Sequence, residues 1–395
     1  MMSKVIIRLR VFLGLILLVG AGTAGCGSSS SDPSDGGPSQ DSNVLPVMIG
    51  GGGLCAGIIN RPCVNVTICI PGSAQCQTVT DILLDTGSVG LRVFKSVLTL
   101  DFSQHLETNG QGNIIGECVI FGTGAVWGSV ANADVILGDE PRVSIPIHLV
   151  DSTFAGQSAA SNPCRQPVDA TPQNAGFNGL LGIDGFESDR GAGIYFSCST
   201  SACALLGRPA NAVLNPVAVL PNDNNGHVIT FPAVDRTGAP TVTGSLLLGI
   251  GTRSNNMPSG VSVLTRDPAT GTITTVYKGT AFPGFFDTGS TFLFFSDPAI
   301  PQCANISGAF CPSSPVNLTA TNQGRNQASS VVNFQIANAN DLGNSGNGVF
   351  DNLGGPDVNM SAEFDWGLPF FLGRTVYTGM AGRGSSLGTG PFWAY

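Results

Sequence analysis

The sequence is short of charge, and above all of lysine. Charged residues make up 11% of the 395 positions, and lysine occurs only at positions 4, 95 and 278. Surface helices are usually rich in Lys, Glu and Arg, so this shortage argues against a protein built from long helices. The formal net charge of −9 would repel a phosphate backbone, and nucleic acid is therefore not an expected partner.

Histidine is equally scarce, which limits the metal and hydrolase chemistry open to the chain. The three histidines, at positions 105, 148 and 227, show no His-Glu-x-x-His spacing, and no Cys-x-x-Cys pair occurs. We therefore expect no metal and no organic cofactor. The Gly-x-Ser-x-Gly match at residues 384–388 has no histidine after it, which excludes the hydrolase order of triad residues. The Asn- and Asp-rich residues 338–357 lack EF-hand spacing, which favours a surface loop over a calcium site.

Apolar residues and glycine are abundant instead. Apolar residues account for 42% of the chain and glycine for 54 positions. This is enough apolar material for a sizeable core. Short runs of β-branched and aromatic residues between glycines are typical of strands joined by turns, so we expect an all-β protein.

The N-terminus has the pattern of an export signal. Basic residues at positions 4, 8 and 10 precede the apolar run Val11–Val19, which is too short for a stable membrane span. The sequence Thr-Ala-Gly-Cys that ends at Cys26 resembles a bacterial lipobox, in which the cysteine is lipidated. We predict a lipoprotein signal peptide over residues 1–26. Thr23 stands where Leu or Val is usual, so export without lipidation is the alternative.

A polar segment follows the predicted signal. From Gly27 to about Asn43 the chain is almost wholly Ser, Gly, Asp and Pro, with little to bury. We assign residues 27–50 to a flexible tether that holds the rest of the chain off a membrane surface. The expected location is the bacterial cell envelope, with an outer-membrane lipoprotein favoured, or the secreted fraction.

Ten cysteines remain when Cys26 is set aside, an even number that suits disulfides in an exported chain. Most of them lie close to another cysteine in the sequence. We expect four local bridges and one longer bridge from the remaining two residues: Cys55–Cys63, Cys69–Cys76, Cys198–Cys203, Cys303–Cys311 and Cys118–Cys164.

The most informative feature is a repeat. Residues 81–94 read DILLDTGSVGLRVF, and residues 284–297 read GFFDTGSTFLFFSD. Aligning the two aspartates pairs Asp85 with Asp287, Thr86 with Thr288, Gly87 with Gly289 and Ser88 with Ser290. One Asp-Thr-Gly after a strand is an ordinary turn. Two copies with matching apolar flanks favour a functional pair.

A second element repeats in the same order. Asn178–Gly182 (NGLLG) ends 97 residues after Asp85, and Phe370–Gly373 (FFLG) ends 86 residues after Asp287. The two copies lie 202 residues apart, counted from Asp85 to Asp287, and this period is far longer than that of solenoid repeats. We therefore expect two homologous lobes.

At these residues the chain resembles the pepsin-like aspartic peptidases, whose two lobes each supply one Asp of a catalytic pair. Residues 178–183 are similar to that family's Asp-Gly-Ile-Leu-Gly-Leu strand, and residues 371–374 to its Ile-Leu-Gly-Asp. The family's flap is a hairpin that begins Tyr-Gly-Thr-Gly and closes over substrate, and its counterpart is Phe121, Gly122, Thr123 and Gly124. The segment FDWGLPFFLGR (364–374) and the terminal GPFWAY more closely resemble a bacterial exported family of unknown function.

The resemblance implies aspartic endopeptidase chemistry at Asp85 and Asp287. Peptide hydrolysis by water needs a base and an acid, and two carboxyl groups that share one proton supply both. Gly87 and Gly289 let the backbone approach the carboxylates closely. By the same resemblance, Thr86 and Thr288 lock the two turns together, and Ser88 and Ser290 bond the outer carboxylate oxygens.

The chain departs from the family at one expected hydrogen bond. The flap tyrosine is replaced by Phe121, which lacks the hydroxyl, and the tryptophan that would bond this hydroxyl is replaced by Arg92. Because both changes affect the same hydrogen-bonded pair, the flap tyrosine and its tryptophan partner, we interpret them as a substituted flap contact. Two other functions stay open: a catalytically silent module that binds peptides or inhibitors, and a structural surface lipoprotein.

The expected fold is an all-β, two-lobed pepsin-like barrel fold with the site in the cleft between the lobes. Residues 51–235 would form the N-terminal lobe with the first DTGS, and residues 236–395 the C-terminal lobe with the second. The expected partners are an extended polypeptide substrate and a membrane, reached through the N-terminal lipid. We expect a monomer.

Overall fold

The structure of the chain is a computed structural model that describes residues 42–122, 124–189, 194–357 and 362–395. The predicted signal peptide, Cys26 and the flap residue Thr123 lie outside these residues. The described residues form 24 strands, and none of the three α-helices is longer than five residues. The all-β prediction is therefore confirmed. None of these helices is long and apolar enough to cross a membrane.

Fifteen strands form one large sheet. In sheet order they are β10 (Cys203–Leu206), β9 (Tyr195–Cys198), β5 (Ile114–Phe121), β6 (Gly124–Ile136), β7 (Val143–Val150), β4 (Val89–Phe94), β8 (Gly179–Ile183), β3 (Cys76–Asp85), β2 (Pro62–Cys69), β1 (Val44–Ile49), β12 (Val242–Leu248), β11 (Gly226–Thr230), β21 (Thr375–Gly379), β24 (Phe392–Ala394) and β13 (Val263–Thr265). β6 also pairs with β2, which closes the strands from β6 to β2 into a barrel.

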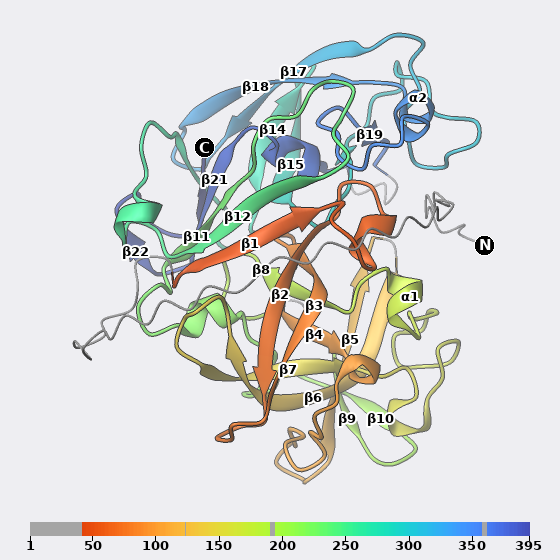
Figure 1. Ribbon diagram of the computed structural model, residues 1–395, viewed down its shortest axis with the longest axis vertical. Helices are drawn as coiled ribbons and strands as arrows, with labels where there is room; N and C mark the ends of the chain where they lie inside the picture. The colour runs from red at the N-terminus through yellow and green to blue at the C-terminus, as the bar shows by residue number, and fades with distance from the viewer. Residues whose placement is uncertain (1–41, 123, 190–193, 358–361) are drawn as a thin grey trace, which may run out of the picture.

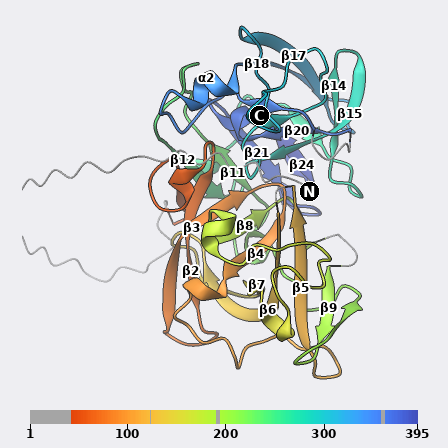
Figure 2. The ribbon, with the colours of Figure 1, turned by 90° about the vertical axis from the view of Figure 1, so that its right-hand side faces the viewer.

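A second sheet has seven strands. In order they are β18 (Ser329–Ile336), β17 (Val316–Gln323), β14 (Ile273–Tyr277), β15 (Thr280–Asp287), β20 (Phe364–Gly367), β16 (Leu293–Phe294) and β19 (Gly354–Gly355). The remaining elements are the hairpin of β22 (Gly384–Ser385) with β23 (Gly388–Thr389), and the helices α1 (Pro172–Ala175), α2 (Ala339–Gly343) and α3 (Leu368–Phe371). Figures 1 and 2 show β2 to β10 in one half of the molecule and the seven-stranded sheet in the other, with β1, β11 and β12 between them.

The strand β1 joins the two halves. All six of its residues pair with β12, from Val44 opposite Leu247 to Ile49 opposite Val242, whereas only two residues pair with β2. The expected flexible tether over residues 27–50 is therefore wrong for residues 44–49. In β1 the apolar residues Leu45, Val47 and Ile49 alternate and are buried, which is the pattern of a half-buried strand.

Buried aromatic rings surround the second Asp turn. Phe286, directly before Asp287, is fully buried. Its ring centroid lies 4.5 Å from that of Phe370 in α3 and 4.9 Å from that of Trp393 in β24. Aromatic contacts of this kind hold the end of β15 rigidly, and they position the carboxyl group that follows it.

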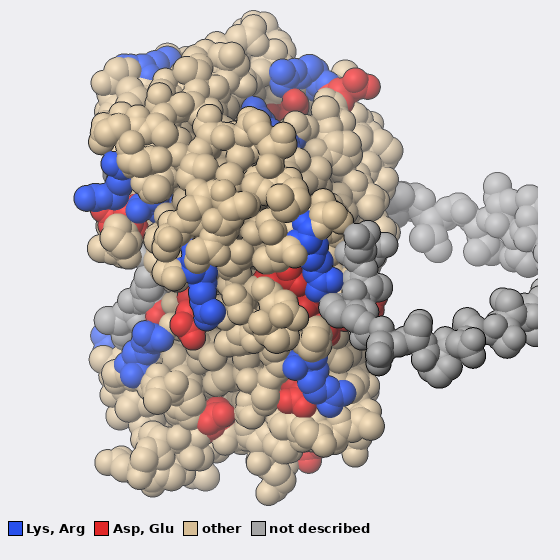
Figure 3. All heavy atoms as spheres, turned by 90° about the vertical axis from the view of Figure 1, so that its left-hand side faces the viewer, with Lys and Arg blue, Asp and Glu red and all other residues tan. Residues whose placement is uncertain are grey.

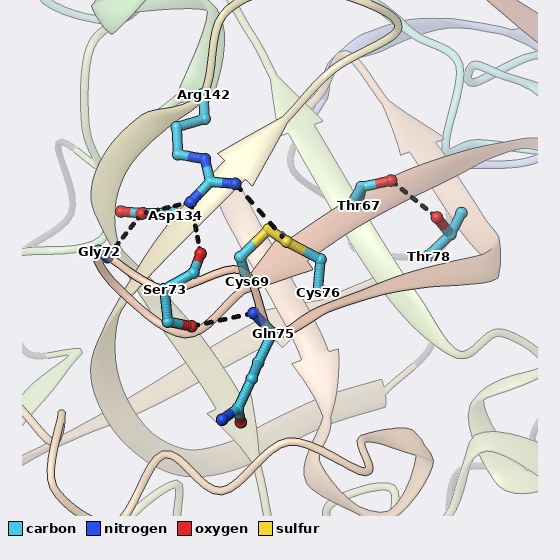
Figure 4. Close-up of a disulfide and its surroundings, with 9 residues drawn as sticks. All are labelled: Thr67, Cys69, Gly72, Ser73, Gln75, Cys76, Thr78, Asp134 and Arg142. Carbon is cyan, nitrogen blue, oxygen red and sulfur yellow. Dashed lines mark hydrogen bonds and ion pairs between the residues drawn. A yellow bond between two sulfur atoms is a disulfide. The ribbon is translucent and has the colours of Figure 1, made fainter.

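All five predicted disulfides are present: Cys55–Cys63, Cys69–Cys76, Cys118–Cys164, Cys198–Cys203 and Cys303–Cys311. Cys69–Cys76 closes the β2–β3 hairpin (Figure 4). Arg142 supports this hairpin because its Nη1 donates to the carbonyl oxygen of Ser73 at 2.7 Å and lies 3.4 Å from Oδ2 of Asp134.

The surface reflects the low charge of the sequence. Figure 3 shows one face of the molecule, on which acidic and basic side chains mostly lie next to each other in small groups scattered over a largely uncharged surface. Within the described ranges, no group of three or more His, Cys, Asp or Glu is arranged to hold a metal ion.

Candidate active site

The two Asp-Thr-Gly-Ser turns occupy equivalent positions in the two sheets. β3 ends at Asp85 and β4 begins at Val89, and β8 lies between these strands, parallel to β3 and antiparallel to β4. In the other half β15 ends at Asp287, and β20 lies between β15 and β16 with the same strand directions. Each aspartate therefore stands at the end of a strand that is paired along its length.

The register corrects one correspondence expected from the sequence. Gly182 lies opposite Asp85, but the residue opposite Asp287 is Gly367, only 80 residues further on, and not Gly373. Both positions require glycine because a Cβ would lie 2.8 Å from Ser88 at the first and 2.0 Å from the carbonyl oxygen of Phe292 at the second. Phe370 and Phe371, which belong to the segment expected as the counterpart of residues 178–182, lie in α3 instead.

Two threonines join the turns to each other. The backbone N–H of Thr86 donates to Oγ1 of Thr288 at 3.2 Å, and that of Thr288 donates to Oγ1 of Thr86 at 3.0 Å. Each hydroxyl then donates across the junction, from Thr86 to the carbonyl of Phe286 and from Thr288 to that of Leu84. Both threonines are buried, so these bonds hold the two halves together where the aspartates emerge.

Each carboxylate is held by its own turn. Oδ1 of Asp85 accepts from the Gly87 N–H at 2.8 Å, and Oδ2 accepts from the Ser88 hydroxyl at 2.5 Å. Asp287 repeats the pattern: it accepts from the N–H of Gly289 at 2.7 Å and from the hydroxyl of Ser290 at 2.9 Å.

The two carboxyl groups meet across the junction between the halves. A Cβ on Gly87 would lie 2.6 Å from Cγ of Asp287, and one on Gly289 would lie 2.9 Å from Oδ1 of Asp85. Burial raises the pKa of Asp287 well above its usual range, and the charge of Asp85 and a hydrogen bond to Asp85 raise it further. This arrangement suits a pair that holds one proton between two carboxyl groups.

A third carboxyl group adjoins the pair, and the sequence analysis did not identify it. Oδ2 of Asp365, in β20, lies 2.5 Å from the hydroxyl oxygen of Ser290. The signal in the sequence was an aspartate inside the otherwise apolar run from Phe364 to Leu372. That same aspartate interrupts the apolar pattern, and this interruption explains why β20 was not recognised as the counterpart of β8.

The predicted flap residues lie at the tip of the β5–β6 hairpin. Phe121 pairs with Gly124, and Gly122 lies in the turn between them. The ring of Phe121 is half-buried in a cluster that includes Phe94, Val126 and Phe177. At the tip, Ile120 is 60% exposed on the opposite face of the strand.

Arg92 does not take the place expected for it beside Phe121. Its Nη2 donates to Oε1 of Glu117 at 3.1 Å and to Oδ2 of Asp189 at 2.9 Å, and its Nη1 donates to the carbonyl of Val89 at 2.6 Å. The interpretation as a contact with the flap tip is corrected: Arg92 contacts the flap strand β5 four residues before Phe121. The two Nη atoms of Arg92 meet two carboxylates and a carbonyl without the flap residue, whereas its buried Nε has no hydrogen-bond partner among the described residues.

These charges form a buried network inside the N-terminal half. Burial acts to raise the pKa of Glu117, but Arg92 and His148 outweigh it and lower that pKa to about 2. His148 Nδ1 lies 2.8 Å from Oε2 of Glu117, and both side chains are fully buried. Burial and the neighbouring Glu117 raise the pKa of Asp189 to about 7. Arg92 therefore neutralises the permanent charge of Glu117.

Comparison with known proteins agrees with this architecture. The chain is similar to the crystal structure of an aspartic proteinase from Irpex lacteus, with a TM-score of 0.52 and 17% sequence identity over 89% of this chain and 96% of that one. At this identity the likeness shows the fold, and the pepsin-like fold class is confirmed. No curated protein sequence matches the chain. The model of a family described as "Protein of unknown function (DUF3443)" matches residues 39–395, and the chain therefore belongs to this family.

Proposed function

We propose that this protein is an aspartic-type endopeptidase that hydrolyses peptide bonds through Asp85, Asp287 and an activated water. One observation carries the proposal: two carboxyl groups from separate halves meet at a junction that Thr86 and Thr288 hold together. A turn with a purely structural role would not need a buried partner of the same charge. Burying two carboxyl groups side by side is costly and is typical of acid–base sites.

The surroundings of Asp287 support a division of roles within the pair. Burial and the neighbouring Asp85 raise the pKa of Asp287, which favours Asp287 as the member that carries the shared proton. Asp85 then takes a proton from water as the water oxygen attacks the peptide carbonyl carbon, and Asp287 gives its proton to the carbonyl oxygen. As the tetrahedral intermediate collapses, Asp85 gives the proton that it took from water to the leaving nitrogen and the C–N bond breaks. A hydroxyl group of the intermediate returns a proton to Asp287, so the pair again holds one proton.

The flap hairpin supports an extended polypeptide as substrate. Phe121 and Phe177 are half-buried and pack against the buried Phe94 at the base of the hairpin tip, and half-buried aromatic rings suit apolar substrate side chains. A monomer would suffice, since both aspartates come from one chain. Five disulfides suggest an exported protein. We propose in addition that lipidated Cys26 anchors it to the bacterial envelope.

The direct test is cleavage of unstructured peptides by the purified protein, followed by mass spectrometry from about pH 3 to about pH 8. We expect a bell-shaped pH profile, because activity needs one ionised and one protonated carboxyl group. Peptide binding without cleavage at any pH would support a second function instead, a silent peptide-binding module. The observation that favours this alternative is the missing hydroxyl at Phe121.

Phe121→Tyr is expected to change kcat/KM by less than about threefold. Arg92 stands where the family has the tryptophan that bonds this hydroxyl, and its guanidinium is already engaged by Glu117 and Asp189. A hydroxyl without a buried partner contributes little. The comparison variant is Phe121→Ala, which removes the apolar contacts of the ring and should lower kcat/KM about tenfold. A large gain in Phe121→Tyr would contradict this account of the flap.

A further inference from the structure

Asp365 is a buried acid that the proposed reaction does not use. It lies in β20, two residues before Gly367, and pairs with Phe285 on β15 and Phe294 on β16. The residue is 9% exposed. Oδ2 contacts the Ser290 hydroxyl at 2.5 Å, whereas Oδ1 is buried without a hydrogen-bond partner among the described residues. A buried carboxylate oxygen without a hydrogen bond costs free energy. We therefore expect the carboxyl group of Asp365 to be protonated or to have a functional role that explains this cost.

The Ser290 hydroxyl requires a proton on one of two carboxyl groups. Its oxygen lies 2.9 Å from Oδ2 of Asp287 and 2.5 Å from Oδ2 of Asp365. A serine hydroxyl carries one hydrogen, so it can donate to only one of these oxygens at a time. The second contact is a hydrogen bond only if that carboxyl group itself carries a proton. Asp287, Ser290 and Asp365 therefore form one proton-holding unit.

The surroundings of this unit are acidic. The charged groups that act on Asp365 are Asp85, Asp357 and Glu363, and Asp365 in turn acts on Asp287. Burial raises the pKa of Asp365 well above its usual range, the Ser290 hydrogen bond opposes this shift, and the three acidic neighbours add to it. A proton bound here is stabilised by every negative charge around it.

The other half of the molecule lacks this third acid. Leu180 in β8 occupies the equivalent register position, opposite Leu83 on β3 and Arg92 on β4. On that side the hydroxyl of Ser88 donates to Asp85. The two halves therefore differ beside the proposed catalytic pair: Asp287 has a third acidic residue near it, and Asp85 has a leucine at the equivalent position.

We propose that Asp365 is a positioning residue that, through the hydroxyl it shares with Asp287, makes Asp287 the proton-carrying member of the pair and preserves this state to higher pH. Its catalytic consequence rests on the proposed peptidase function. When Asp365 ionises, it accepts the Ser290 hydrogen and places a negative charge beside Asp287. That charge disfavours loss of the Asp287 proton, so the active, singly protonated pair survives further into the alkaline range.

The first test is the pH profile of kcat/KM for Asp365→Asn and Asp365→Leu. Asn preserves the shape and a polar partner for Ser290, and Leu copies Leu180 of the other half. Both variants remove the charge, so in both the alkaline limb should move to lower pH by about one unit. The control is Glu363→Gln, which removes a charge of the same sign two residues away and should move the limb by less than about 0.3 unit. Unchanged alkaline limbs in both Asp365 variants would overturn the proposal.

A second measurement does not depend on activity. Infrared spectra distinguish a protonated carboxyl group from a carboxylate, and the band of Asp287 is identified as the one lost in Asp287→Asn. We expect this band to persist to higher pH in the unmodified protein than in Asp365→Asn, by the same margin of about one unit. Equal titration in the two proteins would refute the role of Asp365 even if the unmodified protein cleaves peptides. A protein that cleaves nothing but shows the shift would refute the peptidase function alone.

Discussion

Asp85→Asn and Asp287→Asn are each expected to lower peptide turnover by a factor on the order of 10⁴. Asn has nearly the shape of Asp and can still accept from Gly87 or Gly289, the backbone donors that hold the two aspartates. It cannot, however, exchange a proton with water or substrate. The double variant should be only slightly worse than either single variant, because the two carboxyl groups act as one unit.

The measurement is kcat on a peptide that the unmodified protein cleaves, together with thermal unfolding. Unfolding temperatures should stay the same or rise in the single variants, because each removes one of two neighbouring buried acids. A matched control is Asp101→Asn, which replaces an exposed aspartate and should leave kcat unchanged. Cleavage at the normal rate by both Asp85→Asn and Asp287→Asn would refute the mechanism.

Arg92→Met is expected to lower the free energy of unfolding by about 3–5 kcal/mol. Arg92 is 1% exposed and contacts Glu117, which is fully buried, and Asp189. Methionine fills much of the same volume but leaves the charge of Glu117 in the interior without its guanidinium partner, next to His148 and Asp189. The loss arises from this unpaired charge, and adding Glu117→Gln should therefore recover part of the stability.

Denaturant unfolding with the disulfides intact measures this loss. Lys95→Met is the matched control, three residues along the chain. The Lys95 side chain is 64% exposed and its Nζ lies 3.4 Å from Oδ2 of Asp151, so this variant should cost less than about 0.5 kcal/mol. Equal stability of Arg92→Met and Lys95→Met would show that Arg92 does not stabilise the buried charge of Glu117.

The parts of the fold that repeat were predictable from the sequence, because the second copy of a motif supports the interpretation of the first. Asp85 and Asp287 could be paired from their flanks, and the disulfides from short spacings. β1 was missed although Leu45, Val47 and Ile49 alternate, because the polar run before it was extended too far. Alternation over six residues is a weak signal beside a long compositional bias.

The contacts of Arg92 and Asp365 were not predictable, because they depend on strand register. Arg92 meets Glu117 and Asp189, which lie 25 and 97 residues further along the chain, and no local pattern links these positions. Asp365 was not identified because two neighbouring apolar segments end in glycine, at Gly367 and at Gly373, and the sequence pattern favoured the second. Only the pairing of Asp287 with Gly367 decides between them, since a shift in register reassigns every neighbour of a strand.

The central position of β1 also has a consequence for how the molecule behaves when it is shortened. β1 stands between β2 and β12, and it belongs to the first residues that the structure describes. A chain trimmed past residue 49 would leave β2 and β12 with open backbone donors and acceptors facing each other across a missing strand. Open edges of this kind recruit strands from other molecules. The expected failure of such a truncation is therefore self-association through the exposed edges, even though the aspartates themselves are untouched.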